Sequence, residues 1–269
     1  MEQIRCYLSL RELQRELLNL LLAFDSFCKR EGLRYSLDSG TLLGAIRHKG
    51  FIPWDDDVDL AMPRPDYERL LSYSDKLPEG YFVVDPERDG MSVPFAKFCS
   101  KRVRAQEDAR NEDVEAYLWI DLFPMDGAPV DFGELKKQKR IMYRSIRNNN
   151  LVQMNHDSET GIKGIGKKIA GRLYGFGDTQ DKMLCLAREF ARRFRYDDSD
   201  FVTCLVGVDK DAWSLKKSEF ETTVEHEFAG HLFCAMSCWD DYLAMLYGDY
   251  MEIPPVESRT THCLKAWYA

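Results

Sequence analysis

The chain has 269 residues, of which 45% are hydrophobic and 30% charged, as in an ordinary soluble globular protein. Its formal net charge of -8 argues against a protein that coats nucleic acid, and no apolar run reaches the roughly 18 residues that a membrane-spanning helix needs. No signal peptide precedes the eight scattered cysteines, so we expect reduced, largely buried thiols and a cytoplasmic protein.

The N-terminal region predicts a helix followed by a strand. Ser9 and Glu12 form the pattern of a capping box, in which each residue satisfies a backbone amide of the other. Leucines then recur at helical spacing until Gly32, a residue typical of helix C-termini. Residues 34–38 are expected to form a strand.

A turn of small residues, Ser39-Gly40-Thr41, comes next and leads into an apolar helix at 42–46. A strand, such a turn and a helix start together can bind a phosphate, because glycine lets the backbone approach and the first helical amides are free. The same residues also form ordinary turns. Arg47 at the end of the helix is a further candidate for phosphate binding, although a cation there also suits the helix dipole.

Four aspartates fall within the five positions from Asp55 to Asp59. Read as a strand, Asp57 and Asp59 alternate with apolar residues, so both carboxylates project from one face. Adjacent carboxylates repel each other unless a cation lies between them, and oxygen ligands favour magnesium or manganese. Leu60 occupies the position where a calcium-binding EF-hand loop needs glycine, which excludes that motif. A solvated acidic turn remains the alternative.

Three further features follow the aspartates. Arg64 and Pro65 mark a turn at the start of a short helix, and Arg64 is a possible phosphate ligand. Strands are expected at 81–85 and 94–98. Lys97 lies within the second of these apolar strands, where a lysine is unusual, so we expect it to meet an anionic partner.

Asp121 lies in the apolar run from Tyr117 to Phe123, where an unpaired carboxylate is costly. It needs an arginine, a set of amides or a metal. A capping or salt-bridged aspartate is one reading. With Asp57 and Asp59 on a neighbouring strand, a third metal ligand is the simpler one.

The composition changes after this point, because residues 131–172 contain ten basic and four acidic side chains. Helices are expected near 131–150 and 163–173, followed by a helix at 179–195 and a strand at 201–205. The basic span is either a solvated helical face or a surface that attracts an anionic acceptor or an anionic membrane leaflet. We therefore divide the chain into a core at 1–130, a mostly helical basic segment at 131–200 and a segment at 201–269 that completes the core of one compact domain.

The last segment predicts a helix through Tyr242 and a rigid loop from Tyr247 to Pro255. Four possible zinc ligands precede the helix, but their spacing matches no strong zinc-finger pattern and fits an apolar cluster better. These are His226, His231, Cys234 and Cys238.

Longer motifs carry a resemblance to a known family. The stretch from Ser39 to Asp59 closely resembles the signature of the LicD phosphotransferases, as do Arg64–Tyr67, Trp119–Pro124 and Tyr247–Met251. The resemblance covers almost the whole chain. It implies an α+β fold, with a nucleotidyltransferase-like mixed sheet flanked by helices and a helical basic insertion. The chain has Gly40-Thr41 where that fold has Gly-Ser, and a slightly longer interval before Asp57-Val58-Asp59.

The resemblance also implies an activity: transfer of a substituted phosphate, typically phosphocholine from CDP-choline, to a hydroxyl of a cell-surface glycan or its lipid-linked precursor. One or two magnesium ions at Asp57 and Asp59 would neutralise the diphosphate. Asp121 would complete the metal site or accept the proton of the attacking hydroxyl. The expected phosphate-binding residues are Ser39, Gly40, Thr41, Arg47, Arg64 and Lys97. Asp55 and Asp56 are expected to support the site.

Two rival functions remain open: a nucleotidyltransferase that adds a nucleoside monophosphate to a sugar or small molecule, and a non-catalytic scaffold that binds glycans. The donor alcohol is open too, since CDP-ribitol or CDP-glycerol would use the same phosphate chemistry. A choline group calls for an aromatic cage. The candidate aromatic residues are Trp54, Tyr67, Trp119, Tyr247 and Tyr250.

Overall fold

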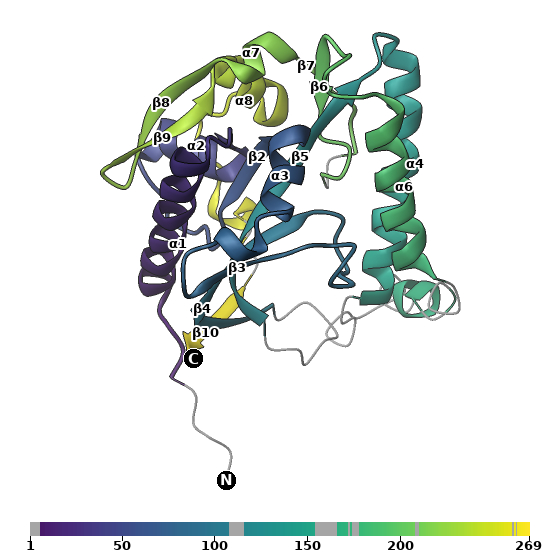
Figure 1. The fold of residues 1–269 in the computed structure, drawn as a ribbon. Coiled ribbons are helices and arrows are strands. Elements are labelled where there is room, and N and C mark those ends of the chain that lie inside the picture. The colour runs from purple at the N-terminus through teal and green to yellow at the C-terminus, as the bar shows by residue number, and fades with distance from the viewer. Residues whose placement is uncertain are drawn as a thin grey trace.

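The fold is organised around a mixed sheet. The structure is a computed structural model, which describes residues 6–107, 116–153, 166–171, 173, 178–207, 210–259, 261 and 263–269. The eight strands of this sheet within the described residues are β1 (Ser36–Leu37), β2 (Asp59–Pro63), β3 (Tyr81–Val84), β4 (Ala96–Glu107), β5 (Ala116–Ala128), β6 (Phe201–Thr203), β7 (Leu215–Lys216) and β10 (Leu264–Tyr268). The main path runs β1–β2–β5–β4–β10, with β3 paired to β4 and β6 joining β5 to β7 (Figure 1). Strands from the beginning, middle and end of the chain therefore build one sheet.

Helices surround this sheet (Figure 1). They are α1 (Leu10–Glu31), α2 (Ser39–His48), α3 (Arg64–Leu71), α4 (Phe132–Gln153), α6 (Thr179–Arg193), α7 (Lys217–Glu221) and α8 (Trp239–Tyr247), with short 3₁₀ turns η1 (Ser74–Lys76) and η2 (Val256–Ser258). Helix α1 packs on β4 and β5, while α4 and α6 pack against each other on the other side of the molecule. The arrangement confirms the predicted α+β fold with a mixed sheet flanked by helices.

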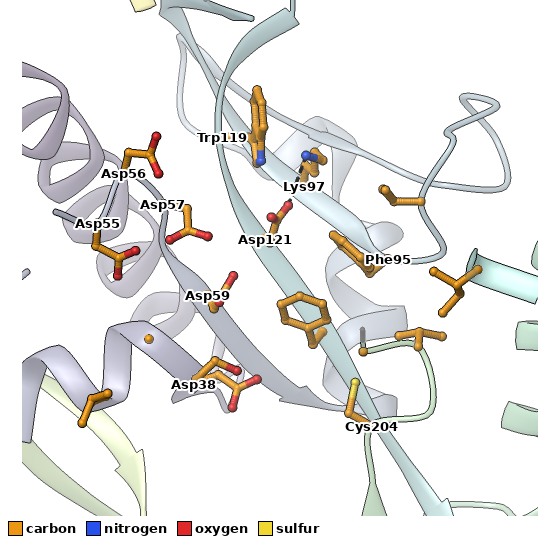
Figure 2. A pocket seen from close by; sticks show the side chains of 18 of the residues that line it. Asp38, Asp55, Asp56, Asp57, Asp59, Phe95, Lys97, Trp119, Asp121 and Cys204 are labelled. Atoms are coloured by element: carbon orange, nitrogen blue, oxygen red, sulfur yellow. Dashed lines mark ion pairs between the residues drawn. The ribbon is translucent and has the colours of Figure 1, made fainter. Parts of the chain in front are cut away.

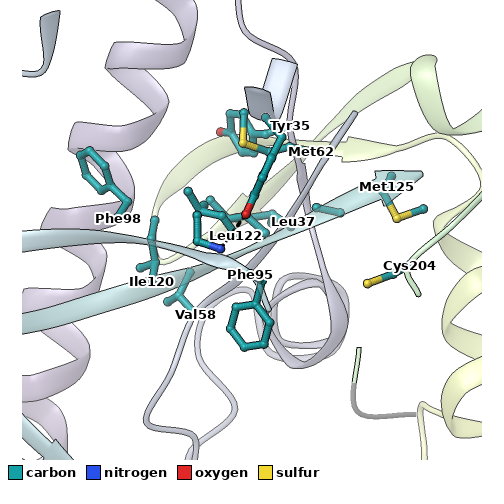
Figure 3. Close-up of a cluster of buried hydrophobic side chains, with 14 of the residues drawn as sticks. Tyr35, Leu37, Val58, Met62, Phe95, Phe98, Ile120, Leu122, Met125 and Cys204 are labelled. Atoms are coloured by element: carbon teal, nitrogen blue, oxygen red, sulfur yellow. Dashed lines mark hydrogen bonds between the residues drawn. The ribbon is translucent and has the colours of Figure 1, made fainter. Parts of the chain in front are cut away.

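The capping box predicted for α1 is confirmed. Ser9 N donates to Glu12 Oε2 at 2.8 Å, Glu12 N donates to Ser9 Oγ, and Gly32 ends the helix with φ +62°. The apolar side of α1 is buried against the sheet, where Phe24 meets Phe98 with ring centroids 5.2 Å apart. Figure 3 shows the same core continuing through Val58, Ile120 and Leu122. This core holds β2 and β5 in place beneath the candidate site.

Some predicted boundaries are wrong. The aspartate strand begins only at Asp59, so Asp57 lies in the segment before it. The strand predicted at 94–98 extends to Glu107, because the long pairing of β4 with β5 overrides the polar residues within it. Ser39-Gly40-Thr41 is the first turn of α2 and not a turn before it.

The hairpin of β8 (Thr223–Phe228) and β9 (His231–Met236) was not predicted. Its turn consists of Ala229 and Gly230, both at positive φ. A two-residue turn of this kind usually contains Asn-Gly or Asp-Gly, so Ala-Gly is a weak signal. His231 and Cys234 lie within this hairpin, and the described residues contain no group of His, Cys, Asp or Glu arranged as a zinc site.

The helices predicted in the basic span are found at α4 and at 166–171, while Lys163 and Ile165 lie outside the described residues. None of the described helices is long and apolar enough to cross a membrane. The eight cysteines are all unpaired, but the expectation that they are largely buried holds only in part: the exposed ones are Cys6, Cys185 and Cys263.

Candidate active site

A cavity of about 510 Å³ opens where the start of α2, the aspartate segment and strands β4 and β5 meet (Figure 2). Its lining is rich in acids: Asp38, Asp55, Asp56, Asp57, Asp59, Glu107 and Asp121. Ser39, Gly40 and Lys97 also line it. Six of the nine predicted site residues therefore come together here. The other three, Thr41, Arg47 and Arg64, do not line the cavity.

Asp59 and Asp121 are brought together by strand pairing. Strands β2 and β5 are parallel, with Asp59 opposite Asp121, and the amide of Asp121 donates to Val58 O at 2.9 Å. Figure 2 shows Asp57 beside this pair, on the segment that leads into β2. The backbone ladder thus holds two of the three predicted ligands opposite each other, and the third, Asp57, lies just before Asp59 in the sequence.

The clustering of carboxylates changes their protonation. Burial raises the pKa of Asp59 well above its ordinary value, and the charges of Asp57 and Asp121 raise it further. Burial also raises the pKa of Asp121, against the opposing effect of Lys97. The neutral forms of both carboxyl groups are therefore favoured, and a cation bound between them would favour the ionised forms instead.

Lys97 is the basic residue closest to these acids in the described cavity lining. It lies opposite Asp121 on the antiparallel strand β4, and its Nζ is 3.3 Å from Asp121 Oδ1. The same Nζ is 3.6 Å from the centroid of the Trp119 ring. This ion pair lacks hydrogen-bond geometry, so among the described residues Asp121 Oδ1 is buried without a hydrogen-bond donor. The predicted anionic partner of Lys97 is Asp121.

Asp57, Asp59 and Asp121 are the side chains that could hold a divalent cation. Their oxygens suit magnesium, and a buried carboxylate oxygen without a donor is free to accept a metal. Within the described part of the chain, however, no three His, Cys, Asp or Glu side chains are already arranged as a metal site. Binding a metal at this position therefore requires the carboxylates to turn, with Asp121 leaving Lys97.

The first turn of α2 faces the acids with its amides. Asp38 is the N-cap but makes no side-chain capping bond, and Ser39 has φ +45°. At Gly40 a Cβ atom would lie 3.1 Å from Asp55 Oδ2, so glycine permits this close approach. Thr41 has a different position: its Oγ1 accepts a hydrogen bond from the amide of Asp59 at 2.9 Å. Thr41 therefore connects α2 to the start of β2.

Arg64 and Arg47 are engaged elsewhere. Arg64 binds Asp126 through two hydrogen bonds, of 2.5 and 2.9 Å, in a largely buried pair. Arg47 donates from Nη1 to the carbonyls of Tyr250 and Glu252. A buried carboxylate such as Asp126 requires a charged partner, which explains why Arg64 is drawn away from the cavity.

Two of the four aspartates support the segment around Asp57. Asp56 is buried, and its Oδ2 accepts hydrogen bonds from Thr261 Oγ1 and from the amide of Leu264, each at 2.9 Å. Gln14 of α1 donates to the carbonyl of Asp55 at 2.8 Å. The start of the chain and its last strand thus hold the aspartate segment from two sides.

Sequence reasoning missed Asp38 and Tyr242. Asp38 is 4% exposed, lines the cavity and accepts a hydrogen bond of 2.5 Å from the hydroxyl of Tyr242 on α8. An aspartate directly before a small-residue helix start was an available signal. Nothing local connected it with α8.

The basic segment also contributes to the cavity. Ile146 and Asn150 of α4 line it, and the ammonium of the buried Lys139 donates to the carbonyls of Cys204 and Gly207. Cys204, Val206 and Gly207 form part of the cavity wall. Helix α4 therefore helps to shape the site.

Three of the five candidate aromatic residues line the cavity: Trp54, Trp119 and Tyr247. Tyr67 is buried, and its hydroxyl accepts from the amide of Ala96. The hydroxyl of Tyr250 donates to Asp240.

Comparisons with known proteins agree with the resemblance seen in the motifs. The family described as "LicD/FKTN/FKRP, nucleotidyltransferase domain" matches residues 32–148. The chain is 31% identical to the lipopolysaccharide cholinephosphotransferase LicD of Haemophilus influenzae, over 97% of this chain and 98% of that protein. It is 46% identical to the human ribitol 5-phosphate transferase FKRP over 57 residues, which are 21% of this chain and 10% of FKRP.

A third relative is the mannosyltransferase regulator 4 of Saccharomyces cerevisiae, 26% identical over 56% of this chain and 13% of that protein. The match to the Haemophilus protein extends over nearly the full length of both chains, and the matched family region contains the aspartate segment and Asp121. The chain belongs to the LicD family.

Proposed function

We propose that the protein transfers a substituted phosphate, in the first instance phosphocholine from CDP-choline, to a hydroxyl of a cell-surface glycan or its lipid-linked precursor. The observation that carries this proposal is the pairing of Asp59 with Asp121 in a cavity that also holds the start of α2. The names of the Haemophilus and human relatives support a transferred choline phosphate or ribitol phosphate. They also support a glycan as acceptor.

The donor diphosphate fits between the amides of Ser39 and Gly40 and the carboxylates of Asp57, Asp59 and Asp121. Free amides at a helix start favour phosphate oxygens. Lys97 adds a positive charge on the same side of the cavity. These groups orient the phosphorus atom for attack by the acceptor.

The three aspartates would hold magnesium or manganese in this proposal. A cation bound there would supply positive charge against the diphosphate, whose bridging oxygen leaves with CMP. A bond forms between the acceptor oxygen and phosphorus, and the bond from phosphorus to the bridging oxygen breaks. As the alternative to holding the metal, Asp121 accepts the proton of the acceptor hydroxyl, a role that suits a carboxylate whose pKa is raised by burial.

The test is a mass-spectrometric screen of CDP-choline, CDP-ribitol and CDP-glycerol for CMP release, with and without magnesium and with candidate glycan acceptors. We expect metal-dependent CMP release and labelled choline phosphate on the acceptor. Asp57→Asn and Asp59→Asn should abolish turnover while the exposed control Asp181→Asn retains it. Near-normal turnover in both purified site variants would overturn the assignment of these residues.

The rival functions give different products. A nucleotidyltransferase would release pyrophosphate from a nucleoside triphosphate. A scaffold would release neither product and would show no magnesium binding by calorimetry. The three carboxylates in one cavity disfavour a scaffold, because such a cluster is costly without a cation.

We also place the reaction in the cytoplasm, with α4 directed to an anionic acceptor or membrane surface. The exposed basic residues of this helix recur along one side: Lys136, Lys137, Arg140, Arg144 and Arg147. Flotation with anionic and neutral vesicles tests whether α4 binds an anionic membrane surface. The salt dependence of the affinity for the acceptor tests whether α4 attracts an anionic acceptor. Glutamate substitutions at Lys137, Arg140 and Arg144 that change neither result would exclude this role.

A further inference from the structure

A second cavity of about 390 Å³ lies beside the active-site cavity. The two share a wall, formed by Ser92, Val93, Lys97, Glu107 and Trp119. The rest of the second cavity is mostly apolar and includes Phe82, Met91 and Tyr117. A ligand could therefore place its phosphate in the first cavity and an uncharged or cationic end in the second.

The strand register places the two cavities next to each other. Asp59, Asp121 and Lys97 are neighbours in one row across β2, β5 and β4. The adjacent row on the same face consists of Trp119, Cys99 and Phe82. Two residues along a strand span about 7 Å, so the aromatic row begins within reach of a short substituent on a phosphate held at Asp121.

Aromatic faces dominate this second row. Phe82 and Tyr117 meet edge to face, with centroids 5.3 Å apart and an interplanar angle of 84°. All three rings already lie near cations of the protein: Lys97 Nζ is over Trp119, the guanidinium carbon of Arg104 is 3.9 Å from the centroid of Tyr117, and Lys101 Nζ is 5.9 Å from the centroid of Phe82. Glu107 adds a carboxylate to both cavities.

This chemistry fits a quaternary ammonium group better than a sugar alcohol. Such a cation carries no hydrogen-bond donor, so it is recognised by aromatic faces and by nearby negative charge. A polyol such as ribitol or glycerol instead needs several hydrogen-bonding side chains. Phe82 and Met91 provide none, Trp119 provides a single N–H donor and Tyr117 a single hydroxyl, and the other polar side chains of the lining are Asp89, Ser92, Gln106, Lys97 and Glu107.

We propose that Phe82, Tyr117, Trp119 and Glu107 form the subsite for the quaternary ammonium of the donor, while its phosphate lies at Asp59 and Asp121. This rests on the proposed function and names the alcohol that the site selects. Lys97 belongs to the shared wall, and Figure 2 shows it near Trp119 and Asp121. On donor binding it moves from the Trp119 ring toward the phosphate, and the ammonium takes its place on the aromatic side.

The test compares CDP-choline with CDP-ribitol and CDP-glycerol in the wild type, Phe82→Leu and Tyr117→Leu. Because each substitution removes one cation–π contact, we expect kcat/KM for CDP-choline to fall about 10-fold in each variant. The affinity for CMP, which lacks the alcohol, should stay unchanged. Tyr81→Leu is the matched control, because Tyr81 is on the same strand but stacks on Phe98 in the core.

Each other outcome has a distinct meaning. An equal loss of affinity for CMP and CDP-choline would make the second cavity a nucleobase site and overturn the proposal. An unchanged preference among the three donors, or a wild type that prefers CDP-ribitol or CDP-glycerol, would also overturn it, while leaving the transfer reaction intact.

If no CDP-alcohol releases CMP, the proposed function fails, and titration with choline chloride decides the subsite separately. Saturable binding by the wild type that is lost in Tyr117→Leu but kept in Tyr81→Leu would support the subsite. No binding by the wild type would refute it.

Discussion

Asp59 and Asp121 face each other across the parallel pairing of β2 and β5, although they lie in different parts of the chain. The pairing is reinforced from both sides, since Thr41 binds the amide of Asp59 and the amide of Asp121 binds the carbonyl of Val58. The backbone hydrogen bonds keep the two residues opposite each other, so their partly buried carboxylates stay close enough for each to raise the free energy of the other's charge. Their geometry costs stability and is therefore expected to serve the reaction.

Replacing Asp59 should separate stability from activity. Because burial and neighbouring acids raise the pKa of Asp59, its proton contributes fully to stability below the ordinary value of 3.8, and this contribution is lost as the pH rises through the folded pKa. At neutral pH without metal, Asp59→Asn should raise the unfolding free energy by about 1–2 kcal/mol and abolish turnover. The melting temperature of Asp59→Asn, measured between pH 4 and pH 8, should depend less on pH than the melting temperature of the wild type. A variant less stable than the wild type at neutral pH would contradict this.

Magnesium should stabilise the wild type at neutral pH. At about 100 times its dissociation constant, one bound ion adds about 2.7 kcal/mol to the unfolding free energy. Melting curves with magnesium and with a chelator measure the difference. Asp57→Asn should lose the shift, whereas the exposed Asp181→Asn should keep it; an equal shift in both variants would place the metal elsewhere.

Thr41 should act through the backbone of Asp59. Thr41→Val removes the acceptor of the Asp59 amide and should cost about 1–2 kcal/mol of stability, because a buried donor is left without a partner. Thr41→Ser keeps the hydroxyl and should restore both stability and turnover. Denaturant unfolding and CMP release measure the two effects. If serine rescues neither, the hydrogen bond is not the reason for threonine at this position.

Arg64 should contribute to stability and not to donor binding. Arg64→Met leaves Asp126 buried without its partner and should cost about 3–5 kcal/mol. Removing both charges, with Arg64→Met and Asp126→Leu together, should recover much of this loss. Denaturant unfolding measures both variants. A folded single variant with a raised KM for the donor and unchanged stability would instead support the role first predicted for Arg64.

Tyr242 should hold Asp38 in the cavity wall. Burial, followed by the charge of Asp38, raises the pKa of Tyr242 well above its ordinary value, so the hydroxyl remains protonated and donates at any working pH. Tyr242→Phe removes this donor without opening a large cavity and should cost about 1 kcal/mol of stability. We also expect a several-fold lower kcat at unchanged melting cooperativity. Wild-type kinetics in a folded variant would show that Asp38 needs no support from α8.

Part of the fold and of the site could be predicted from the sequence. The capping box at Ser9 and Glu12, the helical spacing of α1 and the acidic run at 55–59 are local patterns, and local hydrogen bonds or local repulsion explain them. The motifs around Ser39–Asp59 and Trp119–Pro124 contain Gly40, Asp57, Asp59 and Asp121, which line one cavity, as well as Thr41 and Arg47, which do not. Lys97 was predicted because a lysine is unusual within an apolar strand.

Only the tertiary structure decided how these residues are used. Strand register sets Lys97 against Asp121, and burial assigns Arg64 to Asp126. Neither relationship follows from neighbouring residues, because each depends on which distant strands pair and which charges lose contact with water. The sequence by itself determined that the acidic run, the small-residue start of a helix and Lys97 are candidate groups, because local patterns mark them. The tertiary structure decided which of them face the cavity and which only hold it together.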